Sequence, residues 1–245
     1  MSSGPSDPIR GIFVSGTDTG VGKTQVACAL LRHARNLGSR PIPFKPAETG
    51  ADPVARDAHR LHDAAQPPLP ADQVCLYSLP LPAAPQAAAE RAGVRIFAHA
   101  ILERALLLAS AGDSLLVEAA GGLLVPYDDD LCGADLARLL DLPVLLVART
   151  ALGTVTRTAL SVNEIRRRNL PLLGILLCQT TAEAGPHDDT NAPLIHQLTG
   201  VQPLGTIPYV PEATADTLAH ALVSALAPAA LAKLMRPLLP KIPAG

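Results

Sequence analysis

Two lysines are the most informative residues of this chain, because lysine is rare in it and both stand where chemistry is expected. The chain has four lysines and sixteen arginines. Lys23 lies in the stretch 16–24, GTDTGVGKT, which follows a short apolar strand at 12–14. In such a loop the glycines let backbone N–H groups converge on phosphate oxygens, the lysine reaches the outer phosphates, and the Thr24 hydroxyl joins the coordination of Mg²⁺. The pattern predicts a nucleotide-phosphate site.

One position of this loop departs from the usual spacing. Thr17 stands where the first glycine is expected, and a glycine lies one residue earlier, at Gly16. A strand–turn–helix corner with an exposed lysine is the alternative explanation. The apolar strand before the loop and the helical spacing of apolar residues after it, up to about residue 37, favour phosphate binding.

The second lysine and an acid follow two further apolar runs. Lys45 ends the run 41–45 and precedes Pro46, so it should adopt extended geometry at the carboxyl end of a strand. Ligands of parallel α/β sheets bind at that edge. Glu118 ends the run 114–118, which is typical of a strand buried on both faces. It suits a Mg²⁺ ligand, with a surface carboxylate as the alternative, whereas the acids 128–130 indicate a solvated loop.

The elements that must position these residues alternate along the chain. The runs 12–14, 41–45, 114–118, 143–148, 172–178 and 203–207 predict strands, and 23–37, 52–63, 93–111, 152–168 and 213–226 predict helices. This order predicts an α/β fold, a single P-loop domain over 1–245 with a mostly parallel, doubly wound sheet of about seven strands. The proline-rich stretch 67–85 is expected to be irregular, and 1–10 and about 228–245 to be loosely held ends.

Composition excludes several classes of function. The net charge is −2, aromatic residues make up 2% and tryptophan is absent, so the chain lacks the basic patches and stacking platforms of nucleic-acid binders. It likewise offers nothing to an anionic membrane surface, and no apolar stretch reaches the length of a membrane span. Four scattered cysteines indicate neither a zinc site nor a disulfide framework. With no secretory signal visible, we expect a cytoplasmic enzyme.

Together these stretches resemble the dethiobiotin synthetase family, which acts in biotin synthesis. The resemblance is carried by the loop 16–24, by 44–46 (FKP) with Thr49 and Gly50, by Asp57 and by 117–122 (VEAAGG). Weaker similarity continues through 82–85, 142–144, 151–153 and 204–208, so that it spans residues 10 to 215. The joint appearance of loop, Lys-Pro and Glu strand is specific, since each alone occurs in many ATPases.

The resemblance implies ATP-dependent closure of a ureido ring. One amine of 7,8-diaminononanoate (diaminopelargonate) takes up CO2 as a carbamate, ATP phosphorylates the carbamate, and the neighbouring amine closes the ring and expels phosphate. Both reacting groups are anions, so the enzyme must mainly position them and neutralise charge. The family uses Mg²⁺ with ATP as co-substrate and forms a homodimer.

Carried over residue by residue, the resemblance implies a role for each matching position. Lys23 and Lys45 would be catalytic, and Thr24, Asp57 and Glu118 would hold the metal. The nucleotide would be bound by Thr19, Gly20, Val21, Gly22, Lys23, Thr24, Gln25, Asp57, Glu118, Ala119, Ala120, Gly121, Cys178, Gln179, Pro208, Tyr209 and Val210. The substrate would meet Thr49 and, from the second subunit, Leu152, Gly153, Thr154, Val155 and Thr156.

The chain also differs from the family pattern. Ala119 replaces a glycine after the buried strand, and Thr156-Arg157 replaces Asn-His, which leaves the exact substrate open. Cys178 stands where the family reads adenine with Asn, and cysteine is a poor hydrogen-bond partner, so base selectivity stays open. Two alternatives remain: a partner-switching ATPase of the same P-loop class, and a nucleotide-binding relative without synthetase activity. The first usually has an additional lysine early in the loop, which is missing at 17–19.

Overall fold

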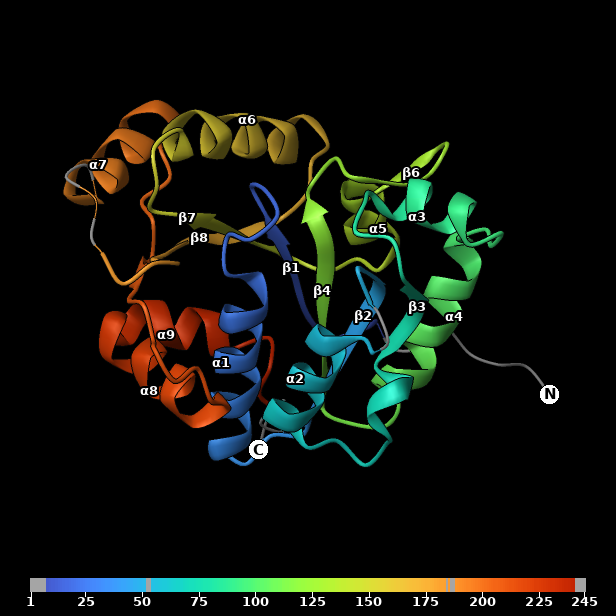
Figure 1. Ribbon diagram of the computed structural model, residues 1–245. Helices are drawn as coiled ribbons and strands as arrows, with labels where there is room; N and C mark the ends of the chain where they lie inside the picture. Colours follow the sequence, from blue (N-terminus) through green and yellow to red (C-terminus); the bar gives the residue numbers. More distant parts are fainter. Residues whose placement is uncertain (1–7, 52–53, 184, 186–187, 241–245) are drawn as a thin grey trace.

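The computed structural model describes residues 8–51, 54–183, 185 and 188–240, and a seven-stranded sheet runs through its centre (Figure 1). The strand order is β3-β2-β4-β1-β7-β8-β9, and every neighbouring pair in this sheet is parallel. This confirms the predicted doubly wound α/β fold. The strands are β1 (Gly11–Gly16), β2 (Pro41–Thr49), β3 (Cys75–Leu79), β4 (Ser114–Gly122), β7 (Val144–Arg149), β8 (Leu172–Cys178) and β9 (Gly205–Ile207).

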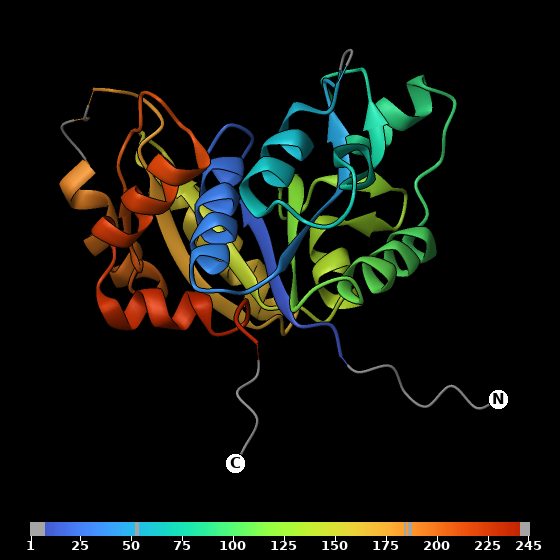
Figure 2. The same ribbon diagram turned by 90° about the horizontal axis from the view of Figure 1, so that it is seen from below.

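Helices cover both faces of the sheet (Figure 2). The two faces hold two hydrophobic clusters, and successive residues of a strand alternate between them: Ile12 and Val14 belong to one, Phe13 to the other. The first face carries α1 (Lys23–Asn36), α2 (Arg56–Ala65), α8 (Ala215–Ala225) and α9 (Pro228–Met235). The second carries α3 (Pro85–Arg91), α4 (Ala98–Ala109), α5 (Gly133–Leu139), α6 (Thr154–Arg167) and α7 (Asp188–Thr199).

The proline-rich stretch 67–85 is more regular than predicted. It contains a short 3-10 helix (Ala71–Gln73) and the edge strand β3, and it ends where α3 begins at Pro85. Prolines at 67, 68 and 70 precede β3, and those at 80 and 82 follow it, so none removes a hydrogen bond from its ladder with β2. The prediction of an irregular excursion was therefore wrong for the strand.

The predicted helices are found with shifted ends. The helix expected at 93–111 begins only at Ala98, and the expected start of α2 at 52–53 lies outside the described residues. The strands of 41–45 and 114–118 are longer than predicted, because β2 runs through Pro46 to Thr49 and β4 continues to Gly122. The acids 128–130 belong to a two-stranded hairpin, β5 (Pro126–Asp128) with β6 (Leu131–Cys132), in which Asp128 pairs with Arg95.

The C-terminal segment is held more firmly than predicted. Helix α9 occupies 228–235, Leu234 and Leu238 are fully buried, and the backbone carbonyl of Leu238 accepts hydrogen bonds from the hydroxyls of Ser39 (2.6 Å) and Ser114 (3.0 Å). Proline starts this helix at its first position instead of preventing it. The expectation of a loose end was wrong up to residue 240, and 241–245 lie outside the described residues. Among the described helices, none has the length and apolar composition of a membrane span.

The arginines 166–168 close α6 as structural residues. Arg167 and Arg168 both donate to Glu164, Arg168 also pairs with Asp135 of α5, and Arg166 donates to the Thr199 carbonyl. The hydrogen bonds from the two guanidinium groups lower the pKa of Glu164 from 4.5 to about 2. Cations at a helix C-terminus also interact favourably with the negative end of the helix dipole.

Replacement of Glu164 tests this cluster. We expect Glu164→Gln to lower the free energy of unfolding by about 1 kcal/mol at pH 7, because Arg167 is solvent-exposed and its pair is partly screened. The folded-state pKa is depressed, so the stabilisation is present above about pH 4.5 and is lost as the pH falls towards 2. Urea unfolding at pH 7 and pH 3 checks this. The exposed Glu103→Gln is the control, and an equal loss at both pH values would contradict the assignment.

Candidate functional site

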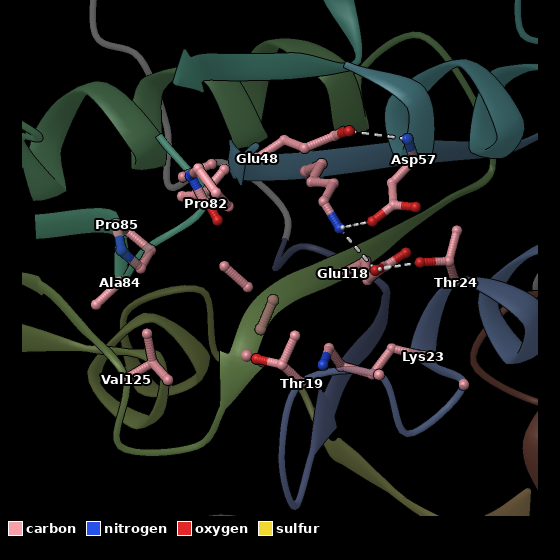
Figure 3. Close-up of a pocket in the computed structure, with 18 of the residues that line it drawn as sticks. Thr19, Lys23, Thr24, Glu48, Asp57, Pro82, Ala84, Pro85, Glu118 and Val125 are labelled. Atoms are coloured by element: carbon pink, nitrogen blue, oxygen red, sulfur yellow. Dashed lines mark hydrogen bonds and ion pairs between the residues drawn. The ribbon is translucent and has the colours of Figure 1, made fainter. Parts of the chain in front are cut away.

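A pocket of about 770 Å³ opens at the carboxyl edge of the sheet, between the phosphate-loop candidate, the ends of β2 and β4, and α2 (Figure 3). Most of the predicted site residues line it: Thr19, Gly20, Gly22, Lys23, Thr24, Gln25, Lys45, Thr49, Asp57, Glu118, Ala119, Ala120 and Gly121. The structure therefore brings together both lysines, the three proposed oxygen ligands and Thr49 from four separate parts of the chain.

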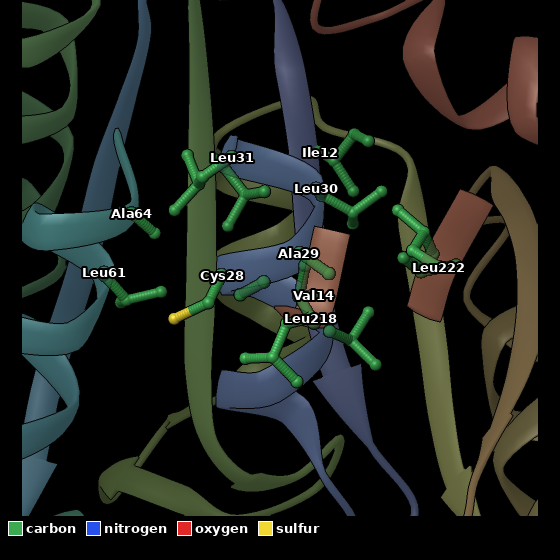
Figure 4. Close-up of a cluster of buried hydrophobic side chains, with 14 of the residues drawn as sticks. Ile12, Val14, Cys28, Ala29, Leu30, Leu31, Leu61, Ala64, Leu218 and Leu222 are labelled. Carbon is green, nitrogen blue, oxygen red and sulfur yellow. The ribbon is translucent and has the colours of Figure 1, made fainter. Parts of the chain in front are cut away.

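Helix α1 is the rigid base of the loop. Its buried side chains Cys28, Ala29, Leu30 and Leu31 pack on Ile12 and Val14 of β1 and on side chains of α2 and α8, among them Leu61 and Leu218 (Figure 4). The helix begins at Lys23, directly after Gly22, so its first N–H groups face the pocket. This packing fixes Lys23 and Thr24 relative to the sheet.

Gly22 can only be glycine in this arrangement. Its φ of 97° lies in the left-handed region, and an added Cβ would lie 2.4 Å from the Sγ of Cys178. Lys23 follows it and donates a hydrogen bond from Nζ to the Asp18 carbonyl at 2.9 Å, curling back over the loop. Burial lowers the pKa of Lys23 to about 8. The geometry is that of a backbone concavity with a cation at its rim, which binds anions.

Lys45 lies between two carboxylates on the floor of the pocket. Its Nζ is 2.7 Å from Oε1 of Glu118 and 3.0 Å from Oδ2 of Asp57. Lys45 is 3% exposed and Glu118 1%, so the ion pair is almost dry. Burial alone would lower the pKa of Lys45, but the two carboxylates raise it above its ordinary value. Burial would raise the pKa of Asp57, and Lys45 lowers it. The ammonium of Lys45 and the carboxylate of Asp57 are therefore charged at neutral pH.

The same corner fits a divalent cation bound together with nucleotide phosphates. The Thr24 hydroxyl donates to Oε1 of Glu118 at 2.9 Å, while Oε2 of Glu118 is buried without a hydrogen-bond partner. Two carboxylates and a hydroxyl are hard oxygen donors suited to Mg²⁺, which usually takes one or two carboxylates and completes its shell with phosphates and water. Within the described residues no cluster of three or more Asp, Glu, His or Cys side chains forms an all-protein metal site.

Several pocket residues were not predicted. Glu48, Arg60, Val125 and Thr180 line it, as do Ala47 and the turn 82–85 before α3. Glu48 is buried and accepts the backbone N–H groups of Asp57 and Ala58, both at 2.9 Å. The sequence gives no signal for this contact, since Glu48 and Asp57 lie on different elements. The position of Arg60, one helical turn after Asp57, could have been found from the spacing alone.

Other predicted residues lie outside this pocket. Val21 is buried under the loop, and Cys178 is fully buried, where its thiol donates weakly to Oε1 of Gln25 at 3.6 Å. Burial raises the pKa of Cys178 to about 11, so the thiol stays protonated. Neither Gln179 nor the stretch Pro208, Tyr209 and Val210 lines the pocket.

The segment 152–156 also lies apart from it. Leu152 is 79% exposed, Gly153 has a φ of 86° before the first turn of α6, and Thr154 is buried with an unpartnered hydroxyl. Arg157 lies beside Gly153, and its Nε is 3.8 Å from Oδ2 of Asp18. The helix N-terminus is thus placed next to the tip of the phosphate loop, not inside the pocket of its own chain.

Comparison with known proteins finds a family model and several similar curated proteins. A family model described as an AAA domain matches residues 10–217. The ATP-dependent dethiobiotin synthetase BioD of Anaeromyxobacter dehalogenans (strain 2CP-C) is 46% identical over 211 residues, which cover 83% of this chain and 92% of that protein. The protein of the same name from Bacillus thuringiensis (strain Al Hakam) is 37% identical over 203 residues, covering 82% and 84%.

Solved structures share the fold at low sequence identity. A MinC:MinD cell division protein complex from Aquifex aeolicus matches with a TM-score of 0.53 at 12% identity, covering 86% of each chain. A ParA family ATPase from Chlorobium tepidum TLS matches with a TM-score of 0.52 at 14% identity, covering 94% of this chain and 92% of that one. At these identities the likeness concerns the fold alone.

The ion pairs of Lys45 predict how the protein binds divalent cations in the absence of nucleotide. Because the Lys45 ammonium neutralises Asp57 and Glu118, it competes with a metal ion for both carboxylates. We expect Lys45→Ala to bind Mn²⁺ about tenfold more tightly than the wild type without nucleotide, equivalent to about 1.4 kcal/mol. Isothermal titration calorimetry measures this. The exposed Lys233→Ala is the matched control, and weaker binding by Lys45→Ala would refute the competition.

Proposed function

The chain belongs to the family of ATP-dependent dethiobiotin synthetases and makes dethiobiotin with ATP, and we propose that its pocket at the carboxyl edge of the sheet is where this reaction takes place. The observation that carries the proposal is the meeting of Lys23 and Lys45 with the oxygen donors of Thr24, Asp57 and Glu118 in one pocket. The substrates are 7,8-diaminononanoate, CO2 or bicarbonate, and ATP.

The reaction joins two anions, and the pocket's cations oppose their repulsion. One substrate amine forms an N–C bond with CO2 and loses a proton, which gives a carbamate. A carbamate oxygen then takes the γ-phosphoryl group of ATP, and ADP leaves. The second amine attacks the carbamoyl carbon, the C–O bond to phosphate breaks, and the ureido ring closes with loss of a proton. Lys23 lies over the loop that would receive the phosphates, and Lys45, which lies between Asp57 and Glu118, would face the carbamate.

Mg²⁺, when bound, supplies charge neutralisation for the β- and γ-phosphates. Thr24, Asp57 and Glu118 would hold it. The buried Oε2 of Glu118 has no hydrogen-bond partner and would be available as a metal ligand. The N–H groups at the start of α1 bind phosphate oxygens, and Thr49 donates or accepts a hydrogen bond at the substrate. In this proposal the nucleotide base meets Gln179 and the stretch 208–210, which directly follow β8 and β9.

The substrate carboxylate is received by a second copy of the chain. A helix N-terminus binds carboxylates, and α6 offers one behind Gly153, with the exposed Leu152 before it. Because 152–156 do not line the pocket of their own chain, they would reach the site of a partner subunit in a homodimer. The enzyme acts in the cytoplasm, where ATP and its other small substrates are supplied.

One incubation tests the activity directly. Purified protein with ATP, Mg²⁺, bicarbonate and 7,8-diaminononanoate should yield dethiobiotin, detected by mass, with one ADP formed per product molecule. A partner-switching ATPase would release ADP at the same rate without the diamine. A nucleotide-binding relative would form neither product, and either result would overturn the proposal.

Replacement of the two lysines should affect ATP binding and turnover differently. Lys45→Ala is expected to leave the Kd for ATP within about threefold of wild type while lowering kcat at least 100-fold, because its charge matters most in the transition state. Lys23→Ala should weaken ATP binding as well, since Lys23 faces the phosphates in the ground state. Calorimetry and steady-state kinetics separate the two effects, with Lys233→Ala as the control. Normal turnover of Lys45→Ala would remove it from the mechanism.

A further inference from the structure

We propose that Glu48 is a positioning residue, which holds Asp57 in the cation site by capping the N-terminus of α2. The inference rests on the proposed role of Asp57 as a metal ligand. Glu48 belongs to β2, eight residues before the first residue of α2. Its carboxylate contacts the backbone N–H of Asp57 and not the Asp57 side chain, so it would act on the site through the backbone.

Helix α2 has no side-chain cap of its own. Its N-cap residue is Ala55, which offers no acceptor to the first N–H groups of the helix. Glu48 supplies two of the missing acceptors from the neighbouring strand: Oε1 accepts from the N–H of Asp57 (Figure 3), and Oε2 accepts from the N–H of Ala58. A negative charge at this end of a helix is also favoured by its dipole.

The bond to Asp57 determines where the Asp57 carboxylate lies. The N–H that Glu48 accepts belongs to the residue whose side chain is 3.0 Å from Lys45 Nζ. Lys45 in turn contacts Glu118, and Glu118 accepts from Thr24. One chain of contacts therefore runs from Glu48 to the phosphate loop, and Glu48 is its anchor on β2.

The shape of β2 makes this contact possible. Residues three apart on a regular strand point to opposite faces, yet Lys45 and Glu48 both reach α2. The alternation of the strand shifts by one residue between them, because Phe44 and Ala47, also three apart, both pack in the second hydrophobic cluster. Pro46, which has no N–H to place in a ladder, lies in this stretch. The shift brings two side chains of one strand to the same helix end.

A role for Glu48 as the proton acceptor of the reaction is less consistent with these contacts. Burial raises the pKa of Glu48, but both of its carboxylate oxygens already accept a backbone N–H, and these bonds direct the carboxylate at the helix end. Removal of the cap should instead displace Asp57 and weaken the cation site, while the reaction itself stays possible when the cation is in excess.

The test uses Glu48→Gln, which keeps the shape but turns an NH2 group towards one of the two N–H donors. We expect the variant to bind Mn²⁺ about tenfold more weakly in the presence of a non-hydrolysable ATP analogue, measured by electron paramagnetic resonance. Its apparent requirement for Mg²⁺ should rise equally, with kcat restored at saturating Mg²⁺. If Glu48→Gln does not fold, Glu48→Asp retracts the charge by one methylene and should shift Mn²⁺ binding in the same direction.

Thr214→Ala is the matched control, because it removes the side-chain cap of α8, which accepts from the Thr217 N–H. It should lower Tm without changing the affinity for Mn²⁺. A Glu48→Gln protein that loses Tm but binds Mn²⁺ like the wild type would show a merely structural cap and refute the inference. A loss of kcat at saturating Mg²⁺ with unchanged Mn²⁺ affinity would refute it in favour of proton transfer.

Asp57→Asn separates this inference from the proposed function. If Asp57→Asn weakens Mn²⁺ binding and Glu48→Gln does not, only the role of Glu48 fails. If Asp57→Asn binds Mn²⁺ like the wild type, the assignment of Asp57 itself is wrong. When both hold, the double variant should lose little more than Asp57→Asn alone, because Glu48 acts only through Asp57.

Discussion

The buried contact of Lys45 with Glu118 and Asp57 is the interaction on which the rest of the site depends. The Lys45 ammonium lies between the two carboxylates, and a buried lysine or a buried Glu118 carboxylate without its partner would be costly. The pair therefore keeps three charged groups in place without a ligand. Its members come from β2, β4 and α2, so the ion pairs also fix these elements at the carboxyl edge.

Much of this arrangement could be predicted from the sequence, because it follows from local rules. Apolar runs ending in Lys45 and Glu118 indicate buried parallel strands, and the carboxyl ends of such strands meet at one edge. The glycines before Lys23 and the helical spacing after it place the loop at the same edge. The sequence thus predicts the central strands, the helix after the loop and the convergence of the charged residues.

What could not be predicted depends on contacts between distant segments. The edge strand β3 has prolines on both sides. That these prolines lie outside the residues paired with β2 becomes clear only once the pairing is known. Glu48 of β2 caps the separate helix α2, and Cys178 lies under Gly22 instead of facing the pocket, because the end of β8 directs Leu176 and Cys178 to the face that carries α1. The C-terminal prolines suggested a loose end, but burial of Leu234 and Leu238 outweighs their local preference.

The carbonyl of Leu238 connects two segments of the chain that lie away from the pocket. It accepts from Ser39 just before β2 and from Ser114 at the start of β4, and these are the two strands that carry Lys45 and Glu118 at their other ends. Leu238, which follows α9, therefore joins the amino ends of both strands at the edge of the sheet opposite the pocket. Removal of the chain behind α8 would leave the hydroxyls of Ser39 and Ser114 without this acceptor. The segment up to Leu238 thus helps to hold together the two strands whose other ends carry Lys45 and Glu118.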